Sequence, residues 1–232
     1  MYVSVAFAKD GVWITMLEAE RAQLAGACHR VAAKGLVTGT AGNLSIRAGD
    51  HVVITPTGGV LEELTPEMMT VVDFEGQIVD GELAPTSELE LHLLVYKKSF
   101  AKAVAHAHGL ASTAVACTHA ELPVIHYSQL MLGGSVRTAP YATFGSPELA
   151  QNVATALEGK TAALMANHGS VAHGQTIASA CETLEMLEWC CELYTRSLTL
   201  GTPSTLTEED LAKVIEAAMN RGYGTTRKAS SD

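Results

Sequence analysis

The chain has 232 residues, of which 47% are hydrophobic and 17% charged, and its formal net charge is −10 at pH 7. The acidic balance and the lack of Lys- or Arg-rich runs argue against a nucleic-acid partner, and no stretch approaches the ~20 apolar residues of a membrane span. This length and composition are typical of one enzyme-sized domain with a well-buried core, so we expect a single domain over residues 1–232.

The cysteines and the first residues bear on where the protein works. The five cysteines show no Cys-x-x-Cys spacing and their number is odd, which is typical of reduced, buried thiols. Residues 1–8 are apolar but lack the basic start and the long apolar segment of a signal peptide. We therefore expect a cytoplasmic protein, and the low charged fraction favours a homo-oligomer.

In the first half of the chain, apolar residues at three- and four-residue spacing predict a helix over 16–34, with Thr15 as its N-cap and Gly35 as its stop. A glycine-rich turn then leads into a hairpin, a second hairpin follows, and a second helix begins after a proline. We expect strands at 43–47, 51–55, 71–74 and 77–79, one helical turn at 65–67, and the second helix up to about residue 100.

In the second half, an apolar strand at 103–107 leads into a short helix at 110–118. The run Ser146-Pro147-Glu148 combines an N-cap, a proline at the first helical position and an acid in the first turn, so it predicts another helix start. The polar tail at 222–232 is expected to be mobile. The remaining expected elements are strands at 161–166 and 170–173 and helices at 177–198 and 208–220.

The order of these elements indicates the fold class. Hairpins outnumber units in which a helix connects two parallel strands, so the sheet should be mixed and mostly antiparallel. A sheet with two apolar faces needs a cover on both sides. We therefore expect an α/β protein with three layers, α/β/α, whose central sheet is covered by helices.

A His-x-His pair ends the strand at 103–107. Successive side chains on a strand alternate between faces, so His106 and His108 point the same way and can bind one ion. His168, in a separate Asn-His-Gly turn, would complete a site of three imidazoles with an open position, as in catalytic zinc centres. Nitrogen ligands favour Zn²⁺, although Co²⁺ and Mn²⁺ are also compatible.

Polar side chains suited to an acid–base step and to an anion surround this pair in the sequence. Glu88 begins the second helix, where an acid also complements the helix dipole, and it would lie beside the metal as a ligand or a proton acceptor. His92 is one turn further on, where it either orients Glu88 or simply packs. Hydroxyl-bearing, glycine-rich turns at 40–43 and 55–59 and the helix start at 86–87 could bind a phosphate.

These segments together resemble the class II sugar-phosphate aldolases, a family that also contains epimerases and the adducin head. The resemblance extends from about residue 35 to 174, and within the family it is strongest to aldolases that cleave L-fuculose 1-phosphate. The segments occur in the family's order: GLVTGTAGNLSIR, ITPTGG, APTSELELH, AVAHAHG, IHYSQLMLGG, APYATFG and MANHGSVAHG.

The resemblance assigns a role to each matching residue. It implies that His106, His108 and His168 bind Zn²⁺, that Glu88 is the catalytic acid–base and approaches the metal when no substrate is bound, and that Tyr127 is a proton donor reaching across a subunit interface. It further implies a homotetramer with active sites at its interfaces. The phosphate pocket implied by the resemblance consists of Asn43, Thr57, Gly58, Thr86 and Ser87.

The implied reaction is the retro-aldol cleavage of a ketose 1-phosphate, such as L-fuculose 1-phosphate, to dihydroxyacetone phosphate and an aldehyde such as L-lactaldehyde. Zinc would act as the Lewis acid, and Glu88 would move a proton at the dihydroxyacetone-phosphate half. We expect desolvation to raise the pKa of Glu88. Tyr127 would exchange a proton with the C4 oxygen.

Three alternatives share the fold. A ribulose-5-phosphate 4-epimerase uses the same chemistry, but Glu88 favours the aldolase because the epimerase has an aspartate as its relevant acid. A decarboxylase acting on a 3-oxo sugar-acid phosphate is disfavoured because no lysine adjoins Glu88. A non-catalytic module like the adducin head is disfavoured because the histidines and the acid are all present.

Two further histidines receive structural interpretations. His126 is expected to pack on the opposite face of a strand from Tyr127. His173 is expected to be a hydrogen-bonded histidine in a loop.

Overall fold

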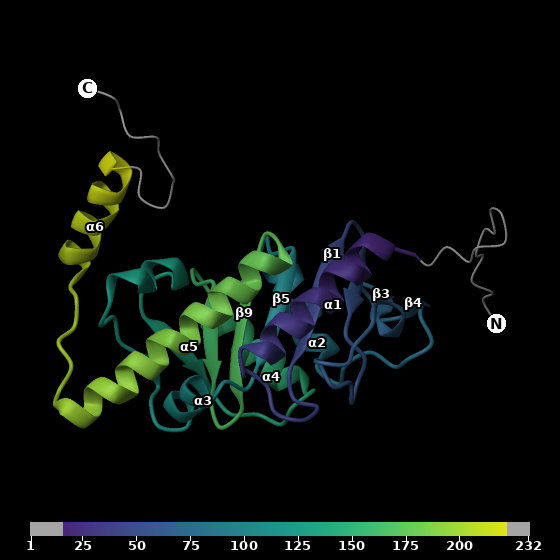
Figure 1. Cartoon of the computed structure of the whole chain (residues 1–232), viewed down its shortest axis with the longest axis horizontal. Helices are drawn as coiled ribbons and strands as arrows, with labels where there is room; N and C mark the ends of the chain where they lie inside the picture. The colour runs from purple at the N-terminus through teal and green to yellow at the C-terminus, as the bar shows by residue number, and fades with distance from the viewer. Residues whose placement is uncertain (1–15, 222–232) are drawn as a thin grey trace.

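A mixed sheet of nine strands forms the middle of the protein in the computed structural model, which describes residues 16–221 (Figure 1). The strand order is β4-β3-β2-β1-β5-β9-β8-β7-β6, and every neighbouring pair is antiparallel except β7 and β8. This confirms the predicted mixed, mostly antiparallel sheet. The strands are β1 Asn43–Ala48, β2 His51–Ile54, β3 Thr70–Asp73, β4 Ile78–Asp80, β5 Ala103–Ala107, β6 Glu121–Leu122, β7 Val136–Ala139, β8 Ala162–Met165 and β9 Gly169–Gly174.

Helices cover both faces of the sheet, as predicted. The alternation of side chains along β5 divides the core in two: Ala103 and Ala105 pack with the helices of one face, and Val104 packs with those of the other. None of the described helices is long and apolar enough to cross a membrane. The first face carries α1 (Glu18–Ala33), α3 (Leu110–Ala116) and α5 (Ile177–Leu200), and the second carries α2 (Leu89–Lys98) and α4 (Pro147–Ala156).

The last described helix, α6 (Glu208–Arg221), lies apart from these layers. An extended segment carries it away from the end of α5, so that it projects from the body of the molecule (Figure 1). None of its residues is buried. The tail at 222–232, the residues at 1–8 and the expected N-cap Thr15 lie outside the described residues.

Two helix starts differ from the sequence-based expectation. The first helix begins at Glu18 rather than at residue 16, because Leu17 adopts a left-handed backbone conformation with φ 58°. The second begins at Leu89, whose N–H bonds to the carbonyl of Thr86 in a turn that precedes the helix. Glu88 is therefore the N-cap residue and does not lie in the first turn.

The segment between α3 and α4 also differs from expectation. The expected strand at Tyr127 was wrong, because a 3₁₀ helix, η2 (Tyr127–Leu132), begins there. The side chain of Gln129 stabilises this turn by accepting the N–H groups of Ile125 and His126 and donating to the carbonyl of Pro123. Two short strands, β6 and β7, flank the 3₁₀ helix and were not predicted.

The register of the central strands determines which residues meet. In β5, His106 lies opposite Asn43 of β1 on one side and opposite Val171 of β9 on the other. The loop before β1 and the turn before β9 therefore lie at the same end of β5, where His108 follows the strand. Residues more than a hundred positions apart in the chain thus surround one point at the sheet edge.

Candidate active site

Three histidines converge at this end of the sheet. His106 and His108 come from the end of β5, and His168 stands in the turn between β8 and β9. Their ring centroids are 4.8–5.0 Å apart, and the ligand atoms they offer all lie within 4.8 Å of one another. The structure therefore brings together the three imidazoles that the spacing placed at one metal.

The protonation of these rings suits a metal site. The Nδ1 of His106 lies 2.9 Å from the carbonyl oxygen of Ser170, so this nitrogen carries a proton and Nε2 is the atom that faces the cluster and can bind a metal. Burial, with the neighbouring imidazoles, lowers the pKa of His108 to about 4, and the same causes lower the pKa of His168. Neutral imidazole nitrogens grouped in this way are the donor set that zinc prefers.

Backbone geometry delivers His168 to the cluster. Asn167 adopts a positive φ of 55°, which the chain tolerates in a tight turn closed by the His168 N–H on the Met165 carbonyl. Gly169 follows because a Cβ there would lie 2.5 Å from the carbonyl oxygen of Ala107. The close approach of this turn to β5 thus needs a glycine directly after the histidine.

Glu88 lies beside the cluster, with 4% of its surface exposed. Its Oε2 accepts a hydrogen bond from Asn43 Nδ2 at 2.9 Å and lies 3.1 Å from His106 Nε2. Its Oε1 is buried, lies 3.5 Å from His168 Nε2, and has no hydrogen-bond partner within the described residues. One carboxylate oxygen is therefore held while the other faces the site.

The expectation of a raised pKa for Glu88 was wrong. Burial does raise it, but the charge and hydrogen bond of His106, together with the hydrogen bond from Asn43, outweigh burial and hold the pKa well below its usual range. The same pairing raises the pKa of His106 against the opposing effect of its own burial. Glu88 is therefore ionised at neutral pH and ready to accept a proton or to approach a cation.

A cavity of about 310 Å³ opens above Glu88 and the histidines. Two loops that form its wall are joined by backbone hydrogen bonds, from Thr57 to the Ala84 carbonyl and from Thr86 to the Thr55 carbonyl. Of the described residues that line the cavity, none is a lysine or an arginine. An anion bound there would rely on hydroxyl and backbone N–H groups. The expected site residues that line the cavity are Asn43, Thr57, Gly58, Thr86, Ser87, Glu88, His108 and His168.

The cavity also contains residues to which the sequence analysis gave no role. Tyr141 and Phe144, with 63% and 65% of their surfaces exposed, line it together with Asn167. The two aromatic residues belong to the segment APYATFG. In the sequence, the feature that could have identified them is a pair of aromatic residues in a turn just before a helix start. Burial in the core does not explain aromatic residues at such a place.

Tyr127 does not line this cavity. It begins η2, stacks on His126 with ring centroids 4.5 Å apart, and leaves 40% of its surface exposed. It borders a separate, mainly apolar cavity of about 380 Å³ between η2 and α6. Within one chain, the structure therefore does not bring Tyr127 to Glu88.

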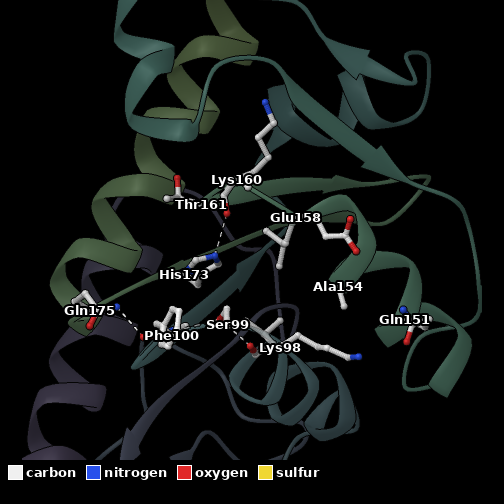
Figure 2. A pocket seen from close by; sticks show the side chains of 14 residues that line it. Lys98, Ser99, Phe100, Gln151, Ala154, Glu158, Lys160, Thr161, His173 and Gln175 are labelled. Atoms are coloured by element: carbon white, nitrogen blue, oxygen red, sulfur yellow. Dashed lines mark hydrogen bonds between the residues drawn. The ribbon is translucent and has the colours of Figure 1, made fainter. Parts of the chain in front are cut away.

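Another cavity, of about 400 Å³, lies at the opposite end of β5, between α2 and α4 (Figure 2). Its polar lining includes Lys98, Gln151 and His173. The Nε2 of His173 bonds to the carbonyl oxygen of Lys160 at 3.1 Å, so this histidine is satisfied within β9 and not in a loop as expected (Figure 2). This cavity contains none of the expected site residues.

Comparison with known proteins identifies relatives along most of the chain. The profile of the family described as Class II Aldolase and Adducin N-terminal domain matches residues 22–195. A 5-methylthioribulose-1-phosphate/5-deoxyribulose-1-phosphate aldolase of Rhodospirillum rubrum is 38% identical over 195 residues, covering 83% of this chain and 88% of the relative. The L-fuculose phosphate aldolase of Escherichia coli is 37% identical over 197 residues, covering 84% and 91% respectively.

The fold agrees with these relatives. A solved structure named L-fuculose 1-phosphate aldolase superposes with a TM-score of 0.84 at 34% identity, covering 88% of this chain and 98% of that one. The residues matched by the family profile include the segments that build the cavity and the histidine cluster. The chain therefore belongs to the class II aldolase and adducin N-terminal domain family and is an enzyme, a lyase of the aldolase type.

Proposed function

We propose that the protein cleaves a ketose 1-phosphate between C3 and C4 to give dihydroxyacetone phosphate and an aldehyde. The observation that carries this proposal is the Glu88 carboxylate. One of its oxygens is held by Asn43, and the other is buried 3.5 Å from His168 Nε2 with no hydrogen-bond partner within the described residues. An ionised carboxylate oxygen beside three imidazoles suits proton transfer at a carbon next to a carbonyl. L-Fuculose 1-phosphate and 5-deoxyribulose 1-phosphate, which occur in the names of a similar solved structure and of a relative, are the first candidates.

His106, His108 and His168 would hold the metal, and Zn²⁺ fits their neutral nitrogen donors best. When bound, the ion supplies a Lewis acid that stabilises negative charge developing on substrate oxygen atoms. Glu88 removes or returns the proton at C3. The hydroxyl groups of Thr57 and Ser87, both exposed in the cavity wall, bind the phosphate away from the reacting carbons and so position them.

We also propose that the enzyme is a homotetramer in which Tyr127 of one subunit completes the site of the next. Its exposure, and its place outside the cavity of its own chain, support this arrangement. The phenol would donate a proton to the C4 oxygen, or take one from it, as the aldehyde forms or reacts.

The test is a coupled assay for dihydroxyacetone phosphate on metal-loaded protein and on a chelated control. Both candidate ketose 1-phosphates are expected to release it only when metal is present, and their rates of release then rank them. Epimerisation of L-ribulose 5-phosphate at C4 without release of dihydroxyacetone phosphate would contradict the proposal. So would an absence of release from fully metallated protein with both ketose 1-phosphates.

A further inference from the structure

A row of buried polar side chains leads from the interior of the layer that contains α2 to the Glu88 carboxylate. Tyr96 Oη lies 2.7 Å from Ser45 Oγ, and Ser45 Oγ lies 2.7 Å from His92 Nδ1. His92 Nε2 lies 2.6 Å from Asn43 Oδ1, and Asn43 Nδ2 lies 2.9 Å from Glu88 Oε2. Ser45 and His92 are completely buried. The row is therefore continuous and shielded from solvent.

Two regular elements create the row. Asn43 and Ser45 are two residues apart on β1 and so share one face of the sheet. Glu88, His92 and Tyr96 are spaced by four residues along the start and body of α2, and so share one face of the helix. When this helix face packs on this strand face, side chains from the helix and from the strand alternate along the row. Their alignment follows from the fold and does not require an unusual loop.

The ionised carboxylate imposes one direction on every hydrogen bond in the row. A carboxylate can only accept, so Asn43 must turn its NH₂ group to Glu88 and its Oδ1 to His92. His92 must then carry its proton on Nε2 and accept at Nδ1 from the Ser45 hydroxyl. The Ser45 oxygen in turn accepts from the Tyr96 hydroxyl. A neutral His92 agrees with its burial, which lowers its pKa to about 3.

Polar groups buried this deeply are costly unless every hydrogen bond is made, and apolar residues could fill the same volume. Without the His92 N–H, the amide of Asn43 could rotate and present its oxygen to Glu88, which would repel the carboxylate. We propose that His92 is a positioning residue that orients Asn43, which ties down Oε2 of Glu88 and leaves Oε1 for proton transfer. The catalytic consequence of this inference rests on the proposed aldolase function, whereas the inferred hydrogen-bond pattern does not.

The first test is the tautomer of His92, read from the ¹⁵N shifts of its ring nitrogens in the labelled, metal-loaded full chain. The expected result is a proton on Nε2 and a bare, hydrogen-bonded Nδ1, with the assignment made by loss of the signals in H92Q. A proton on Nδ1 would overturn the proposal. The tautomer of His92 tests this proposal even if the protein cleaves no ketose phosphate. A lack of cleavage would refute the proposed function and not the hydrogen-bond pattern.

The second test follows the proton step itself. Enzyme-catalysed exchange of the carbon-bound protons of dihydroxyacetone phosphate with D₂O is measured by NMR, alongside kcat, KM and bound zinc. H92F is expected to lower the exchange rate and kcat by about 10²-fold, as small misplacement of a catalytic group does, while KM and zinc content stay within about twofold of wild type. H92Q, which keeps an N–H donor, is expected to recover part of the rate.

The matched control is H173F, which removes a hydrogen-bonded histidine at the opposite end of β5 (Figure 2). It is expected to leave kcat and the exchange rate unchanged. Wild-type exchange in H92F, or a rise in KM with kcat unchanged, would overturn the proposal. If H92F does not fold, the tautomer of His92 and the kinetics of H92Q test the proposal instead. Wild-type exchange in an H92Q protein whose glutamine does not bond to Asn43 would then count against it.

Discussion

At the scale of single residues, Glu88 shows how position alone can mislead. An acid at the start of a helix normally stabilises the helix dipole or caps its N–H groups. Here the side chain makes no capping hydrogen bond and turns to Asn43 and the histidines. Its burial without a full set of partners has a cost that helix stability does not explain, so a role in the chemistry accounts for it better.

Replacing Glu88 by Gln tests that role. The amide keeps the shape but cannot accept the proton, so kcat should fall by about 10²- to 10⁴-fold, while bound zinc and KM change little. Steady-state assays and metal analysis measure both. The control is Glu90→Gln, an exposed acid on the same helix, which should behave as wild type. An E88Q variant that retains most of its kcat would remove Glu88 from the mechanism.

Thr57→Val tests the phosphate pocket. Loss of one hydroxyl hydrogen bond to a charged group should raise KM for the ketose 1-phosphate by about tenfold and leave kcat nearly unchanged, since the group does not touch the reacting carbons. Inhibition by inorganic phosphate should weaken in parallel. Thr155→Val, exposed on α4, is the matched control. Unchanged phosphate inhibition in T57V would place the phosphate elsewhere.

At the scale of elements, the junction between β5 and α3 combines a proposed metal ligand, His108, with a helix start. The first N–H groups of α3 have no cap from their own segment; Glu188 of α5 accepts from Ala111 at 2.7 Å and from Ser112 at 2.9 Å. Gly109 makes room for this carboxylate, because a Cβ there would overlap Oε2 of Glu188. The glycine after His108 therefore couples the strand end to α5, a helix that begins nearly 70 residues later in the chain.

Gly109→Ala should therefore displace Glu188 and destabilise the fold by about 2 kcal/mol, the sum of overpacking and a lost cap, and it should weaken zinc binding through His108. Denaturant unfolding and metal titration measure these effects. Gly26→Ala, in the middle of α1 with open space around the added Cβ, should instead leave stability equal or raise it by up to about 1 kcal/mol. Equal stability of G109A and wild type would contradict the coupling.

At the scale of the whole molecule, the cluster of three histidines joins β5 to the turn between β8 and β9 and exists only in the folded state. A ligand that binds the folded state alone stabilises it by mass action. Zinc at about a thousand times its Kd should add about 4 kcal/mol, which for a chain of this size raises Tm by roughly 10 °C. Calorimetry with zinc and with a chelator measures the shift, and His108→Ala should abolish it. The same Tm in both conditions would contradict a metal centre.

The proposed sharing of sites between subunits also belongs to this scale. Tyr127→Phe and Glu88→Gln should each lower activity in a pure oligomer. Subunits mixed by unfolding and refolding together should regain activity, because some interfaces then pair an intact Tyr127 with an intact Glu88. The E88Q and Y127F preparations assayed together without subunit exchange are the control. No recovery in mixed oligomers, with mixing shown by mass spectrometry, would contradict the sharing of sites between subunits.

Short segments of the sequence predict the local parts of this protein. Near-neighbour geometry accounts for the His-x-His alternation, the apolar spacing of α1 and α5 and the helix start at Ser146-Pro147-Glu148. Each of these features lies within a few residues of its predicted place. The order of hairpins likewise predicts a mostly antiparallel sheet between helices. Such features depend on the pleat of a strand, the pitch of a helix and the chemistry of caps, which short segments express by themselves.

The electrostatics of the site, by contrast, arise only in the tertiary structure. The pKa of Glu88 falls instead of rising because His106 and Asn43, distant in sequence, meet its carboxylate after folding. The sequence left two interpretations of His92, which were orienting Glu88 and simple packing. Only the folded structure shows that Asn43 lies between His92 and Glu88. The 3₁₀ start at Tyr127 depended on the bonds of one glutamine side chain. These outcomes depend on through-space contacts and on burial, which no local spacing in the chain encodes.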